Sequence, residues 1–262
     1  MTPPAIAVAS VTKRFPGPAG DTVALEGASL VVGTGEFVCL IGASGCGKST
    51  LLRIIAGFEV PSGGDVTVRG TPVTGPGPDR GMVFQDYGLF PWLTVRRNIG
   101  FGPESRGKSR AEVTEITDRF LAMIGLTAFA GAYPHQLSGG MKQRVAIARV
   151  LANDARVVLM DEPFGALDAM TRERLQDELL ALWAQTALTI VFVTHAIEEA
   201  IALADRVVVM SPGPGRIVRD VRVDLPRPRD VTSPEFNALR RELSALLHSK
   251  ALPDQAEPPR RE

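Results

Sequence analysis

The stretch from Gly42 to Thr50 contains the residues best suited to bind phosphate, and it fits the pattern G-x-x-x-x-G-K-[ST]. In such a loop, glycines let the backbone turn tightly, so that successive N–H groups point inward at an anion. The Lys48 ammonium can reach the β- and γ-phosphates of a nucleotide, and the Ser49 hydroxyl can ligate Mg²⁺. The pattern predicts a nucleotide-binding loop made of Gly42, Ser44, Gly45, Cys46, Gly47, Lys48, Ser49 and Thr50.

Two acidic residues, Asp161 and Glu162, follow directly after the apolar run from Ala155 to Met160. In a phosphate-binding protein, the first carboxylate at such a strand end is suited to coordinate Mg²⁺. The second is suited to act as a general base or to polarise a water. The alternative is a solvated charge pair in a loop, but the abrupt end of the apolar run favours a functional pair.

Three weaker candidates stand at the ends of other predicted elements. His195 follows the strand predicted over residues 188–193, although a lone histidine is more often structural or at the surface. Ser138 to Gly140 precede a helix predicted over residues 141–149, where they form either a second anion site or an ordinary helix cap. Phe15 precedes a turn, where an aromatic ring either stacks on a base or packs on an edge strand.

The elements that must position these residues alternate between strands and helices. The apolar run from Phe37 to Ile41 predicts a buried strand before the phosphate loop, and Ser49 to Ala56 predict a helix after it. The positive potential at that helix N-terminus favours an anion. Thr94 and Ser109 are suited to cap further helices. Other strands are expected over residues 5–11, 23–32, 65–69, 80–84, 206–210 and 216–223, and other helices over 94–101, 110–125, 171–185, 196–203 and 233–248.

Composition excludes several classes of protein. The chain has 262 residues, 45% of them hydrophobic, which is enough for one large α/β domain or two small ones. Its formal net charge is zero, so nothing suggests a nucleic-acid partner. Two cysteines with no paired spacing indicate a reducing compartment. No secretory signal or apolar run of about 18 residues occurs, so we expect a soluble chain whose partner could lie in a membrane.

An apolar and aromatic stretch, Asp86 to Trp92, follows Gln85 at the end of the strand predicted over residues 80–84. It contains Pro91, which disfavours a helix. Such a loop either packs inward or meets a partner, and both alternatives stay open. Residues 251–262 contain three prolines and mixed charge, and they predict a frayed tail.

Six stretches occur along the chain in an order that is typical of one protein family. They are the phosphate loop, Gln85, Leu137 to Arg144, Val157 to Glu162, Gly165 to Asp168, and Thr194-His195. With this order and spacing, the chain resembles the ATP-binding subunit of ABC transporters over about residues 5–225. The resemblance implies an α/β fold with a phosphate-loop core sheet, an N-terminal antiparallel β portion and a helical insert at about residues 90–133. An ATP-binding domain would span residues 1–230, and a C-terminal helix and flexible tail would span 231–262.

The resemblance also implies roles for residues around the γ-phosphate of ATP. Lys48 would neutralise charge, and Gln85 would lie near Mg²⁺, which Asp161 of the Walker B motif and Ser49 would help to hold. Glu162 would be the catalytic carboxylate, and the switch histidine, His195, would contact the γ-phosphate. Because none of these positions departs from the family pattern, we expect an active ATPase.

The same resemblance implies that two copies of the chain sandwich two ATP molecules. Ser138, Gly139 and Gly140 would bind the γ-phosphate of the nucleotide held by the other copy, and Phe15 would stack on adenine. Ala166 to Asp168 would form the D-loop. ATP would close the dimer and hydrolysis would reopen it, so that energy passes to membrane subunits as motion.

Three stretches are similar to importers of the nitrate, sulfonate and taurine type: Phe84 to Trp92, Asp161 to Asp168, and Ser211 to Arg216. This similarity implies an ATPase on the cytoplasmic face of the membrane that energises uptake of a small anionic or sulfonate-type solute. Its partners would be integral permease subunits and, indirectly, a solute-binding protein, with residues 89–92 lining a groove for a permease helix.

Two other classes stay open at this point. A soluble ABC ATPase that works on ribosomes or DNA usually has two tandem cassettes or long coiled-coil insertions, and it tends to be basic, whereas this chain has one cassette and no net charge. The ATPase of an exporter is disfavoured by the stretch from Leu89 to Trp92.

A separate expectation concerns Cys46, which stands in an anion-binding loop at a helix start. There we expect an activated thiol that a maleimide modifies and MgATP protects, or else a tolerated small residue.

Overall fold

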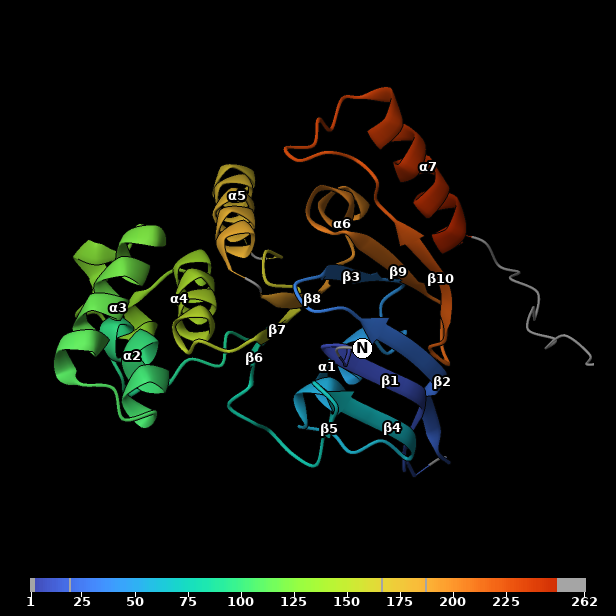
Figure 1. Cartoon of the computed structure of the whole chain (residues 1–262), viewed down its shortest axis with the longest axis horizontal. Helices are drawn as coiled ribbons and strands as arrows, with labels where there is room; N and C mark the ends of the chain where they lie inside the picture. The colour runs from blue at the N-terminus through green and yellow to red at the C-terminus, as the bar shows by residue number, and fades with distance from the viewer. Residues whose placement is uncertain (1–2, 19, 166, 187, 249–262) are drawn as a thin grey trace, which may run out of the picture.

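Two β-sheets organise the fold in the computed structural model, which describes residues 3–18, 20–165, 167–186 and 188–248 (Figure 1). The larger sheet has the strand order β10-β9-β3-β8-β7-β6, and the smaller has the order β2-β1-β4-β5. The larger sheet contains β3 (Phe37–Ile41), β6 (Arg80–Val83), β7 (Val157–Asp161), β8 (Thr189–Val193), β9 (Arg206–Met210) and β10 (Ile217–Arg222). The smaller, antiparallel sheet contains β1 (Ile6–Phe15), β2 (Thr22–Val32), β4 (Gly63–Val68) and β5 (Thr71–Pro72). The expected α/β fold with an N-terminal antiparallel portion is confirmed.

Five neighbouring strands of the larger sheet, β9, β3, β8, β7 and β6, are parallel. Every residue of β3, β7 and β8 is buried, because helices and the second sheet cover a parallel sheet on both faces. The carboxyl ends of parallel strands meet at one edge. The phosphate loop follows β3, Gln85 follows β6, Asp161 ends β7 and His195 follows β8, so strand direction alone brings these residues to the same edge.

The helices among the described residues fall into groups around this sheet. Figure 1 places α2 and α3 together at one end of the molecule, and α7 beside α6 and β10 at the other. Helix α1 packs between the two sheets, where Leu51 and Leu52 are fully buried. No helix of the described ranges is both long and apolar enough to cross a membrane. The helices are α1 (Lys48–Ala56), α2 (Val95–Ser105), α3 (Arg110–Met123), α4 (Gly139–Ala152), α5 (Ala169–Gln185), α6 (Ile197–Leu203) and α7 (Pro234–His248).

Helices α2 and α3, with a 3₁₀ turn at Thr127–Phe129, occupy the stretch expected to form a helical insert. Thr94 caps α2, and Ser109 caps α3 in a capping box with Glu112. Helix α2 was expected to end at Phe101, before a glycine and a proline, but it continues to Ser105. A Cβ atom on Gly102 would lie 2.5 Å from Asn153 Oδ1, so close packing against the end of α4 requires this glycine and holds the last turn.

Smaller departures from expectation occur in three places. Strand β1 continues to Phe15 rather than ending at Val11, because it pairs with both β2 and β4. The short strand β5, which no expected element covered, pairs with β4. The tail expected over residues 251–262 lies outside the described residues, as does Ala166 of the expected D-loop.

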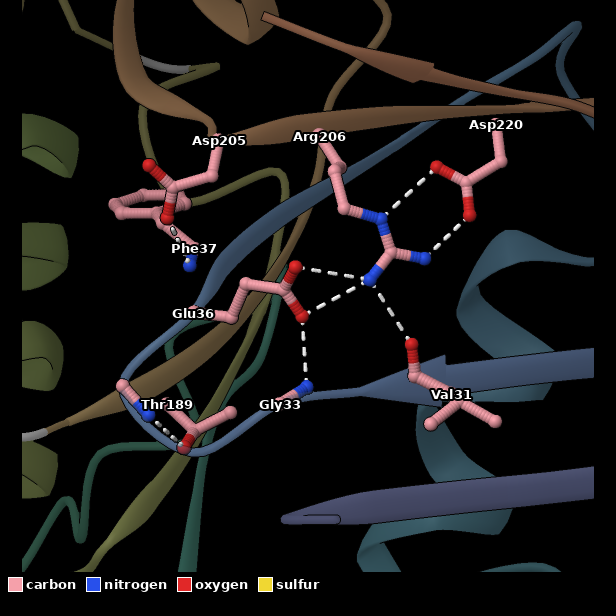
Figure 2. A network of polar contacts seen from close by, with 9 residues as sticks. Val31, Gly33, Glu36, Phe37, Thr189, Asp205, Arg206 and Asp220 are labelled. Atoms are coloured by element: carbon pink, nitrogen blue, oxygen red, sulfur yellow. Dashed lines mark hydrogen bonds and ion pairs between the residues drawn. The ribbon is translucent and has the colours of Figure 1, made fainter.

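A polar network at the opposite edge of the larger sheet fixes the start of β3 (Figure 2). Arg206 of β9 donates from Nη1 to both carboxylate oxygens of Glu36, at 2.9 and 3.0 Å, and to the Val31 carbonyl. It also donates from Nε to Asp220 Oδ1 of β10, 3.0 Å away. The hydrogen bonds to Asp220 and Glu36 raise the pKa of Arg206. Because Gly33 N–H in turn donates to Glu36, the turn between β2 and β3 is tied to β9 and β10 before the strand that leads to the phosphate loop.

Candidate active site

A cavity of about 370 Å³ opens at the carboxyl edge of the larger sheet. This volume lies within the range of roughly 300–1,000 Å³ occupied by small-molecule sites. Ten of the residues predicted from sequence line it, together with Ala24, for which no sequence signal exists. The ten are Ser44, Gly45, Cys46, Gly47, Lys48, Ser49, Thr50, Gln85, Glu162 and His195. Gly42, Phe15, Asp161 and Ser138 to Gly140 are not part of its lining.

The phosphate loop holds Lys48 close to its own backbone. The ammonium donates to the carbonyl oxygens of Gly42 and Ala43, at 2.8 and 2.9 Å, and only 6% of Lys48 is exposed. Gly47 precedes α1 with φ of 92°, and a Cβ atom there would lie 2.6 Å from the Ala24 carbonyl, so this position requires glycine. No side chain caps α1, which leaves its first N–H groups suited to bind an anion beside the ammonium.

Two oxygen-bearing side chains meet where β7 ends and α1 begins. The Ser49 hydroxyl donates to Asp161 Oδ1 at 2.8 Å. Burial raises the pKa of Asp161, because its charged form loses hydration, while the Ser49 hydrogen bond opposes that shift. Among the described residues, no group of three or more His, Cys, Asp and Glu side chains forms a ready-made metal site. This donor set fits Mg²⁺, which typically binds one or two protein oxygens and takes its other ligands from phosphates and water.

Glu162 and His195 face each other at the cavity. Glu162 Oε2 lies 3.3 Å from His195 Nδ1. The histidine side chain is 69% exposed, whereas that of Glu162 is 25% exposed, so the histidine stands at the rim and the carboxylate lies further in. Glu162 also has a left-handed backbone, with φ of 47°, which is strained for a residue other than glycine. The pair can present a hydrogen-bond acceptor to a water and a ring nitrogen to a phosphate oxygen.

The N-terminus of α4 stands apart from this cavity. The Ser138 hydroxyl accepts a hydrogen bond from Met141 N–H at 3.3 Å, so its role as a helix cap is confirmed. Ser138 and Gly139 are exposed. A Cβ atom on Gly140 would lie 3.1 Å from Leu167 Cδ2, so a glycine here allows the first turn of α4 to pack closely against the segment after Glu162. The role of this helix start as a second anion site stays a prediction.

Phe15 lies at the end of β1 and is 36% exposed. The Lys13 ammonium lies 4.8 Å from the centre of the Phe15 ring and makes a cation–π contact with it. The exposed part of the ring is available to stack on a base. Stacking on adenine stays a prediction, and so does the alternative of edge-strand packing.

The expectation of an accessible, reactive thiol at Cys46 is wrong. Only 1% of this residue is exposed, and it belongs to the apolar cluster that contains Leu51 and Leu52. A Cβ atom on Gly42 would lie 2.6 Å from the Cys46 sulfur, so the side chain fills space beside the loop rather than occupying a free position. Cys46 is still among the residues that line the cavity, although its side chain packs in the core.

The aromatic stretch after Gln85 divides into an anchored part and an exposed part. Asn98 is fully buried and holds the Phe90 backbone through two hydrogen bonds, of 2.9 and 3.1 Å. The Phe90 ring lies 4.5 Å from that of Phe101 and 5.6 Å from that of Trp92, measured between ring centres. Trp92 is 70% exposed. The alternative of inward packing therefore holds for Phe90, whereas contact of the exposed Trp92 with a partner stays a prediction.

Arg149 of α4 connects that helix to the same loop. Its guanidinium donates to the Gly88 carbonyl at 2.6 Å and lies 5.2 Å from the centre of the Phe90 ring. Burial lowers the pKa of Arg149. The sequence offered no signal for this contact, since an arginine near the end of a helix is ordinarily solvated.

Comparisons with known proteins agree with this geometry. A family model described as "ABC transporter" matches residues 25–165. An uncharacterised ABC transporter ATP-binding protein of Methanocaldococcus jannaschii is 52% identical, over 94% of this chain and 92% of that protein. The nitrate import ATP-binding protein NrtD of Synechocystis sp. is 48% identical, over 93% of this chain and 95% of that protein. The taurine import ATP-binding protein TauB of Chromobacterium violaceum is 50% identical, over 90% and 92%.

Solved structures of an ABC transporter cassette are also similar. A dimeric structure of a bacterial cassette has a TM-score of 0.77 and 34% identity, covering 83% of this chain and 98% of that chain. A second structure, of a post-hydrolysis state of the same cassette bound to ADP and Pi, has a TM-score of 0.77 and 33% identity, with the same coverage.

Proposed function

The chain belongs to the ABC transporter family as an ATP-hydrolysing cassette, and from this premise we propose that it energises the uptake of a small anionic solute. The nitrate and taurine import proteins that resemble it over at least nine-tenths of its length support an importer of such solutes. An ATPase of this kind works with integral permease subunits, at the cytoplasmic face of the membrane, and receives solute indirectly from a binding protein.

The observation that carries the proposal is the cavity that joins Lys48, Ser49, Glu162 and His195. Transfer of a phosphoryl group to water needs positioned charge and an oriented water, with little covalent chemistry from the protein. Lys48 neutralises charge on the β- and γ-phosphates of ATP, helped by the free N–H groups at the start of α1. Glu162 orients the attacking water, and His195 contacts the γ-phosphate from the rim.

Ser49 and Asp161 would hold Mg²⁺ in this site, with Gln85 lining the cavity nearby. The ion, when bound, would supply positive charge that neutralises the phosphates of ATP and stabilises the transition state. The carboxylate of Asp161 is buried without a salt bridge to any described residue, which suits a group whose charge is balanced by a cation.

A second copy of the chain completes each site in this proposal. Ser138, Gly139 and Gly140 lie outside the cavity of their own chain, and Ser138 and Gly139 are exposed. Two copies that face each other place these N–H groups over the γ-phosphate bound by the partner's loop. Phe15 stacks on the adenine of the ATP held by its own chain, and Leu167 and Asp168 lie beside the shared interface.

The exposed side of the aromatic loop is the proposed contact with the permease. Trp92 projects outward, and its ring lies beside that of Phe90, which in turn lies beside that of Phe101 on the helical insert. The loop also begins directly after Gln85, which lines the cavity. A permease helix seated against Trp92 is therefore connected to the nucleotide through a few residues of backbone.

The test is capture of an integral membrane partner on the tagged chain, followed by reconstitution of the complex in phospholipid vesicles. ATP enclosed in the vesicles should drive uptake of labelled nitrate, taurine or another sulfonate from outside. The same complex made with Glu162→Gln should take up none. An active ATPase that captures no integral membrane protein would contradict the proposal and favour a soluble ABC ATPase.

A further inference from the structure

Gln143 is a buried polar residue on α4 that faces the main chain of Glu162. Its Nε2 donates a hydrogen bond to the Glu162 carbonyl oxygen at 3.2 Å. Only 1% of Gln143 is exposed. Its other amide atom, Oε1, is buried and has no hydrogen-bond partner within the described part of the chain. A buried, unpaired acceptor destabilises a fold, so packing alone gives no reason for an amide at this position.

The backbone that Gln143 contacts is held in a strained conformation. Glu162 has φ of 47°, which a residue with a side chain adopts only when its surroundings impose it. Its N–H donates to the Val193 carbonyl at 3.0 Å, at the end of β8, and its carbonyl accepts from Gly165 N–H at 3.2 Å. Gln143 supplies the third contact, and it is the one that comes from outside the strands and the loop.

We propose that Gln143 is a positioning residue for ATP hydrolysis, which fixes the Glu162 main chain and thereby aims the Glu162 carboxylate. Rotation of the Glu162 peptide would move its side chain, whose Oε2 now lies 3.3 Å from His195 Nδ1. The inference rests on the proposed role of Glu162 in orienting the attacking water. A positioning error of about 1 Å in such a group is enough to lower turnover by about a hundredfold.

The place of Gln143 on α4 gives the contact a second consequence. The helix begins with Ser138 as its cap, and Gln143 lies little more than one turn further on. The same rigid element therefore carries the residues proposed to bind the partner's ATP and the amide that holds Glu162. A shift of the helix when the two copies close would reach the Glu162 backbone through this hydrogen bond.

The experiment compares Gln143→Leu with wild type in steady-state ATP hydrolysis. Leucine has a similar volume but no donor, so kcat should fall by at least about tenfold while KM for ATP changes by less than about twofold, because Lys48 and the phosphate loop still bind nucleotide. The Tm should not fall, since the variant also removes an unpaired buried acceptor. A slow variant should still form a dimer in ATP.

Gln143→Glu keeps the size of the side chain but opposes the Glu162 carbonyl with a second acceptor, and it should lose kcat at least as strongly. The matched control is Thr117→Val, which also removes a buried polar group from the helical part of the molecule but lies outside the cavity. It should retain the wild-type kcat.

Two results would overturn the proposal. Gln143→Leu could keep its kcat, or it could lose kcat together with Tm and ATP-dependent dimerisation, which would make Gln143 a purely structural spacer under α4. Glu162→Gln is measured alongside to separate the proposed role of Gln143 from that of Glu162. If Glu162→Gln keeps its turnover, both roles fail; if it is inactive while Gln143→Leu is fully active, the role of Gln143 alone fails.

Discussion

The two halves of the nucleotide site differ in how completely one copy of the chain builds them. Lys48 and Ser49 come from one part of the sequence and Glu162 from a distant part, yet they meet in one cavity. The start of α4 carries an equally distinctive motif, but Ser138 and Gly139 are exposed and lie outside that cavity. The difference teaches that one copy by itself brings together the residues proposed to bind the phosphates of ATP, whereas the role proposed for the start of α4 needs a nucleotide held by another molecule.

Glu162→Gln is the sharpest test of the part of the nucleotide site that a single copy of the chain forms. The amide keeps the shape of the side chain but no longer attracts a proton from water, so turnover should fall by about 10²–10⁴-fold while ATP binding persists. Phosphate release and bound-nucleotide stoichiometry measure the two effects. Glu198→Gln, on an exposed acid of α6, is the control and should stay active. Near-normal phosphate release from Glu162→Gln would remove the carboxylate from the mechanism.

A second variant tests the half that depends on another copy. Unhydrolysed ATP should hold Glu162→Gln as a dimer, and adding Ser138→Arg places a bulky side chain where the partner's γ-phosphate must lie. The double variant should bind ATP through Lys48 but elute as a monomer in gel filtration. Ser109→Arg, which removes the corresponding cap of α3, is the matched control and should leave the dimer intact at a cost of about 1 kcal/mol in stability. A double variant that still dimerises in ATP would reduce Ser138 to a helix cap.

Trp92→Ala extends the comparison to the surface proposed for the permease. Because Trp92 is 70% exposed, its loss should change the stability of the isolated chain by no more than about 0.5 kcal/mol. ATP hydrolysis by the isolated chain should stay nearly intact while uptake in reconstituted vesicles is lost. Val231→Ala, at another exposed apolar residue, should leave uptake unchanged. Unfolding of the isolated Trp92→Ala chain would make this residue part of the core and end the docking hypothesis.

The smallest effect is expected at Cys46, where the structure contradicts one of the two alternatives left open by the sequence, a thiol that a maleimide reaches. In a Cys39→Ser background, Cys46 is the remaining thiol, and brief exposure of the native chain to a maleimide should label little of it, with or without MgATP. Mass spectrometry after urea treatment should then show full labelling. Rapid labelling of the native chain would mean that the phosphate loop opens far enough to expose its core side.

Continuous motifs made much of the fold and of the site predictable. The strand expected over Phe37 to Ile41 is observed with those bounds, because a short, wholly apolar run before a glycine-rich loop favours a buried strand over a helix. Ser109 was expected to cap a helix and does so, because a serine followed three residues later by glutamate satisfies two N–H groups at a helix start. The resemblance to ABC ATP-binding subunits, carried by six such motifs, is confirmed by the family match and by relatives of about 50% identity.

The motifs were less informative wherever a residue's surroundings come from elsewhere in the chain. The end of α2 was placed too early, because Gly102 and Pro103 usually stop a helix and nothing local reveals that Asn153 packs against that glycine. The thiol of Cys46 was expected to be accessible, because a loop motif does not say which of its side chains turn into the core.

By itself, the sequence determined which chemical groups are proposed to act on ATP: the ammonium of Lys48, the hydroxyl of Ser49 and the carboxylates of Asp161 and Glu162. Only the tertiary structure decided that Glu162 faces His195 at 3.3 Å and that an amide of α4 holds its strained backbone. The physical reason is that a phosphate loop, a cap or a buried strand is specified by neighbours along the chain. Contacts between β7, β8 and α4 depend instead on how separate elements pack, which no local period or motif encodes.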